Sequence, residues 1–252
     1  MPKTVKNPAV KNLAVQSWCF RSFKDNQKVA DLLKGLGLSN IELCGVHCDF
    51  MTPGVWDGVL KTYKDAGVGI VSIGVEGFSP DAEAARQRFE FAKKAGCKVM
   101  SANFHPGTFA KTVPVVTKLA DEYGINLAIH NHGGYHWLGN SEVLEHVFNI
   151  TSPRIGLCLD TAWALDASQD PVKMAEKFAS RLYSVHIKDF VFDKAGLPED
   201  VVVGTGNLKL PELLKTVKKS GFTGNMILEY EGDVENPVPA LAKCVAAVNA
   251  AA

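Results

Sequence analysis

The stretch LYSVHIKD, residues 182–189, shows the pattern that decides the fold: an apolar, β-branched run that ends in imidazole and charged side chains. Seven similar short runs recur along the chain, and longer amphipathic segments separate them. This alternation predicts parallel strands joined by crossover helices. The eight predicted strands are Asn12–Trp18, Asn40–Gly45, Val68–Glu76, Cys97–Phe104, Asn126–His132, Ile155–Thr161, Leu182–Phe190 and Asn225–Glu231.

Helical periodicity and helix-ending glycines support the same alternation. In the segment 83–95, alanine and phenylalanine recur at spacings of four and three along one face. The predicted helices are Glu83–Ala95, Ser141–Phe148, Asp170–Ser180, Leu210–Ser220 and Pro237–Ala250. Glycines that end helices are expected a few residues before strands, at Gly35, Gly67, Gly96, Gly124 and Gly221.

The repeat length favours a closed barrel. Eight units in 252 residues give 252/8, about 31 residues per unit, which is the size of one βα repeat. We therefore predict an α/β protein with a single (β/α)8 barrel domain, the TIM barrel fold, over residues 1–252. An open doubly wound sheet is the alternative, but residues 18–21 (WCFR), after the first strand, lack the glycine-rich dinucleotide fingerprint.

Composition excludes several classes of protein. Lys plus Arg is 27 and Asp plus Glu is 27, so the net charge is zero, which argues against a nucleic-acid or anionic-membrane partner. No apolar run approaches the roughly 18 residues of a membrane span, and the N-terminal residues lack a signal-peptide core. We expect a cytoplasmic protein. Six cysteines are too sparse for a disulfide scaffold, and we interpret them as buried free thiols.

Polar side chains follow the apolar runs at the end where barrel active sites are built. His130, Asp160, His186 and Glu229 end four consecutive predicted strands. Buried imidazoles and carboxylates need partners or a cation. Two of each suit a divalent transition metal better than calcium. The sequence therefore predicts a metal site in the barrel mouth, with Gln16, Glu42, His105 and Glu231 on the same rim.

Other residues at the strand ends are candidates for substrate binding. Lys188 lies two residues beyond His186, so strand alternation places both on one face. We expect its ammonium near a substrate hydroxyl, carboxylate or phosphate, and a salt bridge to Glu231 or Asp189 is the alternative. The remaining candidates for the pocket are Glu42, His105, His132 and Trp163.

Two weaker patterns have an ordinary structural interpretation beside a functional one. Trp18, Trp137 and Trp163 all follow strand ends, where they form either an aromatic wall against a sugar ring or packing at the rim. Residues 204–207 (GTGN) follow the seventh strand, where barrels often bind phosphate. A short Gly-x-Gly is common in plain turns, and we favour the turn.

The segments AIHNHG (128–133), GLCLDT (156–161), VHIKD (185–189) and ILE (227–229) resemble the xylose-isomerase-like TIM-barrel superfamily of sugar isomerases and epimerases. The resemblance covers nearly the whole chain. It implies one divalent metal held by His130, Asp160, His186 and Glu229, with Mn²⁺ as the first choice and Co²⁺, Mg²⁺, Fe²⁺ or Zn²⁺ as alternatives. It also implies a small carbohydrate substrate and leaves a homo-oligomer, dimer or tetramer, open.

Two departures from the family pattern affect the expected chemistry. The ligand on the fifth strand is usually Glu, and here it is His130; the sixth-strand motif is often Asp-Thr-Gly-His, and here Trp163 occupies the last position. We expect Glu229 and His130 as the catalytic residues, with Glu229 or a pocket histidine as the base. One dominant base favours isomerisation or elimination over freely reversible epimerisation.

The resulting hypothesis is a metal-dependent isomerase or epimerase that acts on a sugar or sugar phosphate through an enediolate. The alternatives are a lyase or dehydratase acting on a keto-sugar or 3-keto-glycoside, and a non-catalytic sugar-binding subunit. An apurinic-site endonuclease shares the barrel in this superfamily. The zero net charge and the absence of extra metal-ligand residues near Asp160 argue against it.

Overall fold

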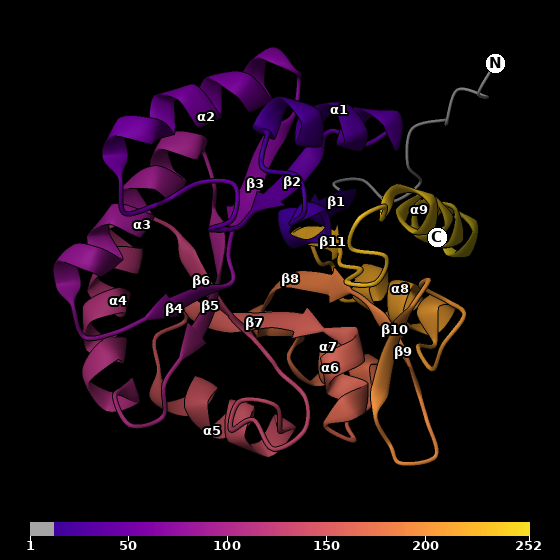
Figure 1. The fold of residues 1–252 in the computed structure, drawn as a ribbon. Coiled ribbons are helices and arrows are strands. Elements are labelled where there is room, and N and C mark those ends of the chain that lie inside the picture. Colours follow the sequence, from indigo (N-terminus) through magenta and orange to yellow (C-terminus); the bar gives the residue numbers. More distant parts are fainter. Residues whose placement is uncertain (1–12) are drawn as a thin grey trace.

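The computed structural model describes residues 13–252 and contains a barrel of parallel strands surrounded by helices (Figure 1). Asn12, predicted to begin the first strand, and the N-terminal residues before it lie outside this range. The strands follow the order β3-β2-β1-β11-β8-β7-β6-β5-β4, and every neighbouring pair is parallel. Their bounds are β1 Leu13–Gln16, β2 Asn40–Leu43, β3 Gly69–Ile73, β4 Glu76–Phe78, β5 Val99–Phe104, β6 Asn126–His130, β7 Ile155–Asp160, β8 Leu182–Ile187 and β11 Asn225–Leu228.

The predicted third strand is divided into two, and this break closes the barrel. β3 pairs with β2 and β4 pairs with β5, so one segment supplies both edges of the sheet. Gly74 lies at the break with a φ of +147°, and a Cβ at this position would lie 2.6 Å from the carbonyl oxygen of Ser101. A side chain has no room there, so only glycine allows the chain to pass this close to β5.

Nine α-helices are found among residues 13–252, and the five predicted from the sequence are all present with shifted ends. Four of the expected glycines, at 67, 96, 124 and 221, have positive φ near helix ends, as predicted. Gly35 was predicted wrongly: it is the last residue of α1, and Gly37 adopts the left-handed conformation instead. The helices are α1 Asn26–Gly35, α2 Pro53–Asp65, α3 Ala82–Ala95, α4 Phe109–Tyr123, α5 Ser141–Ile150, α6 Thr161–Asp166, α7 Pro171–Lys177, α8 Leu210–Lys219 and α9 Val238–Ala251.

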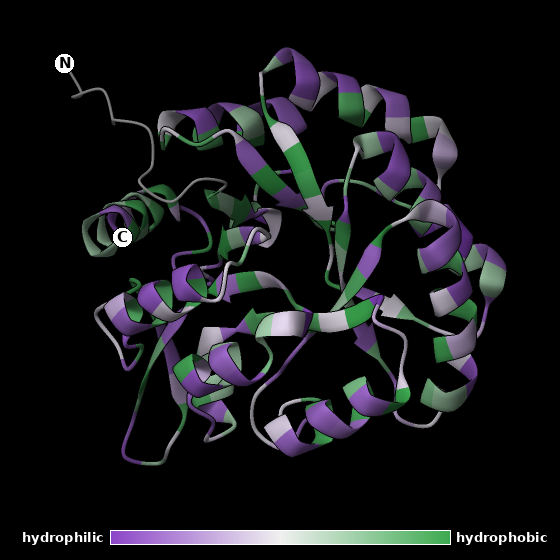
Figure 2. Ribbon diagram, turned by 180° about the vertical axis from the view of Figure 1, so that it is seen from behind, coloured by the Kyte–Doolittle hydropathy of each residue, from purple (hydrophilic) through white to green (hydrophobic). Residues whose placement is uncertain are grey.

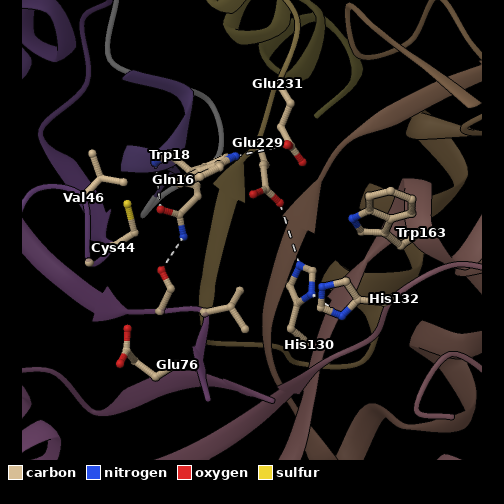
Figure 3. A pocket seen from close by; sticks show the side chains of 13 residues that line it. Gln16, Trp18, Cys44, Val46, Glu76, His130, His132, Trp163, Glu229 and Glu231 are labelled. Atoms are coloured by element: carbon tan, nitrogen blue, oxygen red, sulfur yellow. Dashed lines mark hydrogen bonds and ion pairs between the residues drawn. The ribbon is translucent and has the colours of Figure 1, made fainter. Parts of the chain in front are cut away.

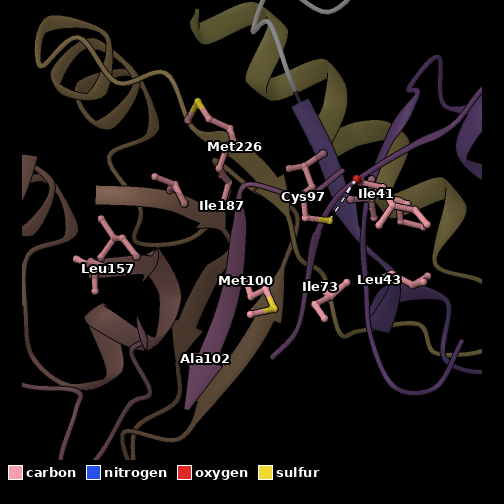
Figure 4. Close-up of a cluster of buried hydrophobic side chains, with 14 of the residues drawn as sticks. Ile41, Leu43, Ile73, Cys97, Met100, Ala102, Leu157, Ile187 and Met226 are labelled. Carbon is pink, nitrogen blue, oxygen red and sulfur yellow. Dashed lines mark hydrogen bonds between the residues drawn. The ribbon is translucent and has the colours of Figure 1, made fainter. Parts of the chain in front are cut away.

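The hydrophobic core lies between the strands and the helices. In β8, Val185 and Ile187 belong to this core, while the polar Ser184 and His186 alternate with them. The helices carry bands of apolar residues between polar ones (Figure 2), and the buried residues of α8, for example, are all apolar. Figure 4 shows part of the cluster, in which Met100 of β5 lies near Ile73 of β3. Alternation therefore leaves the polar side chains of the strands for the inside of the barrel.

The chain after β8 differs from the predicted strand Leu182–Phe190. β8 ends at Ile187, and an antiparallel hairpin follows, formed by β9 (Asp189–Phe192) and β10 (Pro198–Val201). The buried carboxylate of Asp189 accepts hydrogen bonds from the backbone N–H groups of Gly204, Gly206 and Leu208. These amides are therefore occupied by Asp189, which agrees with a structural turn at residues 204–207.

Two other expectations concern the chain as a whole. All six cysteines are buried free thiols, as predicted from their number and spacing. Among residues 13–252, none of the helices combines the length and the apolar character needed to cross a bilayer.

We expect Asp189→Ala to destabilise the fold strongly. The substitution removes a charged acceptor and leaves three backbone donors without a partner, which costs about 3–5 kcal/mol. Urea denaturation measures the free energy of unfolding. Asp193→Ala is the matched control, because Asp193 accepts from the N–H groups of Ala195 and Leu197 in an exposed turn. Equal losses in the two variants would contradict this role of Asp189.

Candidate metal centre and pocket

Four side chains from neighbouring strands meet at the C-terminal end of the barrel. His130 ends β6, Asp160 ends β7, His186 lies in β8 and Glu229 follows β11. All four are buried, and one potential ligand atom from each lies within 4.8 Å of all the others. It is the one group of at least three such residues that residues 13–252 bring together in this way.

Glu42 of β2 fixes the orientation of His186. The His186 Nε2 lies 2.8 Å from Glu42 Oε1, and its Nδ1 lies 3.0 Å from Glu229 Oε2. The Glu42 carboxylate also accepts hydrogen bonds from Gln16 Nε2 and Ser101 Oγ. A histidine whose Nε2–H donates to a carboxylate presents a free Nδ1 to a cation. Glu42 thus directs the other nitrogen of His186 toward the cluster.

Different hydrogen bonds fix the backbone and the side chain of Asp160. The Asn131 side-chain amide forms hydrogen bonds with both the N–H and the carbonyl oxygen of Asp160, at 2.8 and 2.9 Å. Asp160 Oδ1 accepts from the N–H of Trp163 and caps helix α6. Asp160 Oδ2 and His130 Nε2 are buried without a hydrogen-bond partner and lie 3.4 Å apart. Two unsatisfied buried atoms therefore face each other in the cluster.

The pKa shifts in the cluster show that it stabilises positive charge on its histidines and negative charge on Glu229. Burial lowers the pKa of His130, but Asp160 and Glu229 outweigh it and raise this pKa to about 9. Burial likewise opposes the charged form of His186, whose pKa is nevertheless held well above its usual value, with Glu42 and Glu229 among the causes. Burial alone would raise the pKa of Glu229, but Lys188 and His186 hold it well below its usual value.

A divalent cation fits this arrangement. Ligands at roughly 2.1 Å from one cation lie about 3–4 Å from one another, and the pairs in the cluster are separated by 3.0–3.8 Å where an interaction is formed. Nitrogen and carboxylate oxygen are ligands of Mn²⁺, Fe²⁺, Co²⁺ and Zn²⁺. A cation would also satisfy the unpaired atoms of Asp160 and His130.

A pocket of about 570 Å³ opens above the cluster. His130 and Glu229 lie on its wall together with His132 and Trp163, and Gln16, Cys44 and Glu76 lie across from them (Figure 3). Burial and the positive charge of neighbouring histidines lower the pKa of His132 to about 3. The His132 ring is therefore neutral at neutral pH, and its Nδ1 lies 3.5 Å from Nδ1 of His130.

Lys188 lies behind the pocket wall instead of on it. Its side chain is only 1% exposed and forms ion pairs with Glu231 and Asp200. Its ammonium also lies 5.2 Å from the centroid of the Trp163 ring. Burial opposes the charge, but the surrounding carboxylates outweigh it and raise the pKa of Lys188. The salt bridge to Glu231 that the sequence left as an alternative is present.

Two predicted pocket residues lie elsewhere. Glu42 is completely buried below the cluster, where its carboxylate is occupied by His186, Gln16 and Ser101. His105 is exposed and lines a neighbouring cavity with Trp137. His132 and Trp163 do line the pocket, and Gln16 and Glu231 lie on it as expected.

Sequence reasoning missed three residues that shape this region. Glu76 lines the pocket and pairs with Arg88 of α3 at 2.6 Å. Cys44 lines the pocket wall beside Gln16. Asn131 fixes the backbone of Asp160, and its place between two histidines at the end of a strand was the only signal for it.

Comparisons with known proteins agree with this architecture. A family model described as "Xylose isomerase-like TIM barrel" matches residues 30–247. The rhizopine catabolism protein MocC of Rhizobium meliloti is 28% identical over 141 residues, which cover 49% of this chain and 43% of MocC. An inosose dehydratase of Bacillus velezensis is 28% identical over 138 residues, covering 48% and 46%. The chain thus spans less than half the length of these curated relatives.

Solved structures match nearly the whole chain. A sugar phosphate isomerase/epimerase from Parabacteroides distasonis has a TM-score of 0.77 at 19% identity and covers 99% of this chain and 98% of its own. The IOLI protein, solved with a zinc atom, has a TM-score of 0.74 at 15% identity and covers 95% and 97%. At these identities the matches establish the fold.

We expect the protein to bind one divalent cation per chain and Asp160→Asn to lose it. Asparagine keeps the oxygen that caps α6 but removes the negative charge facing His130, so cation affinity should fall at least about tenfold. Isothermal titration with Mn²⁺ and Zn²⁺ measures the affinity. Asp166→Asn, a change in the same helix outside the cluster, is the control. Equal cation affinity in the wild type and Asp160→Asn would contradict the site.

Proposed function

Because the chain belongs to the xylose isomerase-like TIM barrel family, we propose that it is a divalent-metal-dependent enzyme that acts on a sugar. The proposed reaction removes the proton α to a sugar carbonyl and forms an enediolate. Return of the proton to the neighbouring carbon gives isomerisation, and return on the other face gives epimerisation. We place the cation on His130, Asp160, His186 and Glu229.

One observation carries this proposal: a buried His/Asp/His/Glu cluster with two unpaired ligand atoms lies directly beside a pocket of sugar size. A solvated or purely structural cluster would pair its buried polar atoms within the protein. Here Asp160 Oδ2 and His130 Nε2 form no hydrogen bond within the protein and face each other only at 3.4 Å, while two residues of the cluster, His130 and Glu229, also line the pocket. This combination supports a site that acts on a ligand through a cation.

The residues of the chain have separable proposed roles. A cation bound in the cluster would supply Lewis acidity that stabilises negative charge developing on the sugar oxygens. Glu229 is ionised and lies on the pocket wall, so we propose that it accepts the α-proton. His130 Nδ1 faces His132 Nδ1, and a hydrogen bond between them would fix His130 with its Nε2 free for the cation. His132 is then a positioning residue.

The charges on the pocket favour a neutral sugar over a sugar phosphate. Glu76, Glu229 and Glu231 line it, and none of its lining residues is Lys or Arg. The nearest candidate ammonium, on Lys188, is buried behind the wall in ion pairs. A phosphate dianion would meet carboxylates with no lining Lys or Arg to balance them, which is unfavourable in a partly desolvated pocket.

Elimination is the second candidate reaction. An enediolate that loses a substituent from the adjacent carbon gives a dehydratase or lyase, and the inosose dehydratase named above is one similar protein. His130 in place of a carboxylate also leaves a single clear proton acceptor, which supports one-way proton removal. The family and the cluster support both reactions, and product analysis separates them.

The first expected outcome is exchange of the α-proton with solvent. We expect the cation-loaded protein in D₂O to incorporate deuterium at the α-carbon of at least one sugar in a panel of ketoses, ketose phosphates and keto-glycosides. Nuclear magnetic resonance measures the incorporation, and a chelator should abolish it because the enediolate then loses its stabilisation. Sugar binding without exchange across the panel would favour the non-catalytic binding subunit.

The second expected outcome distinguishes Glu229 from His132. Glu229→Gln should reduce kcat by at least about 100-fold, because it removes the proposed base. His132→Ala should cost about tenfold, because the proposed role of His132 is indirect. Both are measured at saturating cation with the bound metal quantified. Glu235→Gln, an exposed site, is the matched control. A larger loss in His132→Ala would reverse the assignment of the base.

A further inference from the structure

A second cavity of about 560 Å³ lies beside the pocket at the same end of the barrel. We call it the aromatic groove, and it is lined in part by Phe78, Phe104, His105, Tyr135, His136 and Trp137. We propose that the aromatic groove is a subsite for a second, uncharged ring, so that the substrate is a glycoside and not a free monosaccharide. This inference rests on the proposed function.

The two cavities adjoin along two independent segments. On β4, Glu76 lines the pocket and the next residue, Gly77, lines the groove. In the loop after β6, His132 lines the pocket and His136 lines the groove, and their rings lie 4.9 Å apart. The two cavities are therefore neighbours, and we place the second ring of the proposed ligand across these shared segments, with the first ring beside the metal cluster.

The aromatic side of the groove is rigidly supported. The Phe104 and Phe78 rings are stacked at 6.1 Å, and Phe109 packs edge-on against both Phe104 and Trp137. The indole N–H of Trp137 donates to the carbonyl oxygen of Phe104 at 2.9 Å. Because Phe78 and Phe104 are buried, the ring that this packing holds in place at the groove is the half-buried Trp137, which suits the apolar face of a sugar ring or an aromatic ring.

Side chains at the rim of the groove are exposed and free to contact a ligand. Tyr135 is fully exposed at 108%, the highest exposure among the large hydrophobic side chains of residues 13–252. His105 is exposed as well, and its Nδ1 accepts from the N–H of Gly107 at 3.1 Å. The neutral tautomer then carries its proton on Nε2, where it is available to donate to a ligand hydroxyl.

The chemistry of the groove selects an uncharged occupant. Its lining residues include no Lys, Arg, Asp or Glu, so no side chain there neutralises a phosphate or an ammonium group. The polar groups it offers are the imidazoles of His105 and His136, the Asn103 amide and the Tyr135 hydroxyl. Aromatic faces with a few neutral hydrogen-bonding groups match a sugar or a phenolic ring joined to the reacting sugar.

The test compares the phenyl and methyl β-glycosides of 3-ketoglucose, which differ only in the group that would enter the groove. The assay follows exchange of the α-proton in D₂O. For the wild type we expect kcat/KM for the phenyl glycoside to be about tenfold higher than for the methyl glycoside, which is the usual effect of filling an apolar subsite. The dissociation constants, measured by calorimetry, should differ in the same direction. Equal values in both measurements would overturn the proposal.

Gly77→Leu is the decisive variant. A Cβ at Gly77 meets nothing within 4 Å and its φ is not in the left-handed region, so the new side chain should occupy the groove without disturbing the fold. We expect the phenyl-to-methyl ratio to fall to near one, with cation content unchanged. Tyr135→Ala should lower the ratio in part. Gly54→Leu, at an open position in α2, is the matched control and should keep the wild-type ratio.

Failure of the proposed function gives a different result. If no sugar of the panel exchanges its α-proton, these two glycosides included, the catalytic proposal is wrong, and calorimetry still decides the subsite. Tighter binding of the phenyl glycoside that is lost in Gly77→Leu supports the groove. Binding that is unaffected by the variant overturns it, whatever the outcome of the exchange assay.

Discussion

Burial of ionisable side chains in one barrel mouth is the constraint on which the rest of this structure depends. His186 is completely buried between two carboxylates, with Glu42 on its Nε2 and Glu229 on its Nδ1. Each group is costly to desolvate alone, and each lowers the cost of its neighbour. Glu42, His186 and Glu229 form a row of hydrogen-bonded side chains, and Gln16 and Ser101 donate to the Glu42 end of it. The Glu229 end faces the pocket, and this is where a cation can be added.

Individual residues in and after several strands also position the cluster and the pocket. Asn131 fixes the backbone of Asp160, and Gly74 lets β3 and β4 pass close to β5 so that the barrel closes around the cluster. Lys188 adds a buried ammonium that holds Glu231 at the pocket rim. The loop after β8 uses its backbone amides on Asp189 and not on a ligand. The backbone amides of this loop therefore stabilise the fold.

Much of this could be read from the sequence, for a physical reason. Apolar runs that end in polar residues reveal both strand period and strand direction, so the barrel and the convergence of His130, Asp160, His186 and Glu229 followed from local patterns. Local patterns did not predict how deep a side chain lies in the barrel or which way it points. Glu42 lies below the cluster and Lys188 behind the wall because of ion pairs with residues more than 40 positions away. Asp200 of the hairpin β9–β10 also pairs with Lys188, which ties the hairpin to the same region.

His130 changes the balance of charge in a way that links the two cavities. With two carboxylates and two imidazoles, the cluster matches the charge of one divalent cation, whereas a third carboxylate would leave an excess negative charge. Of the pocket carboxylates, Glu76 pairs with Arg88 and Glu231 with Lys188, whereas Glu229 faces the histidines of the cluster. A pocket without a lining Lys or Arg offers no cationic side chain to an anionic substrate. The subsite proposed in the aromatic groove, which also lacks charged side chains, agrees with this preference for an uncharged ligand.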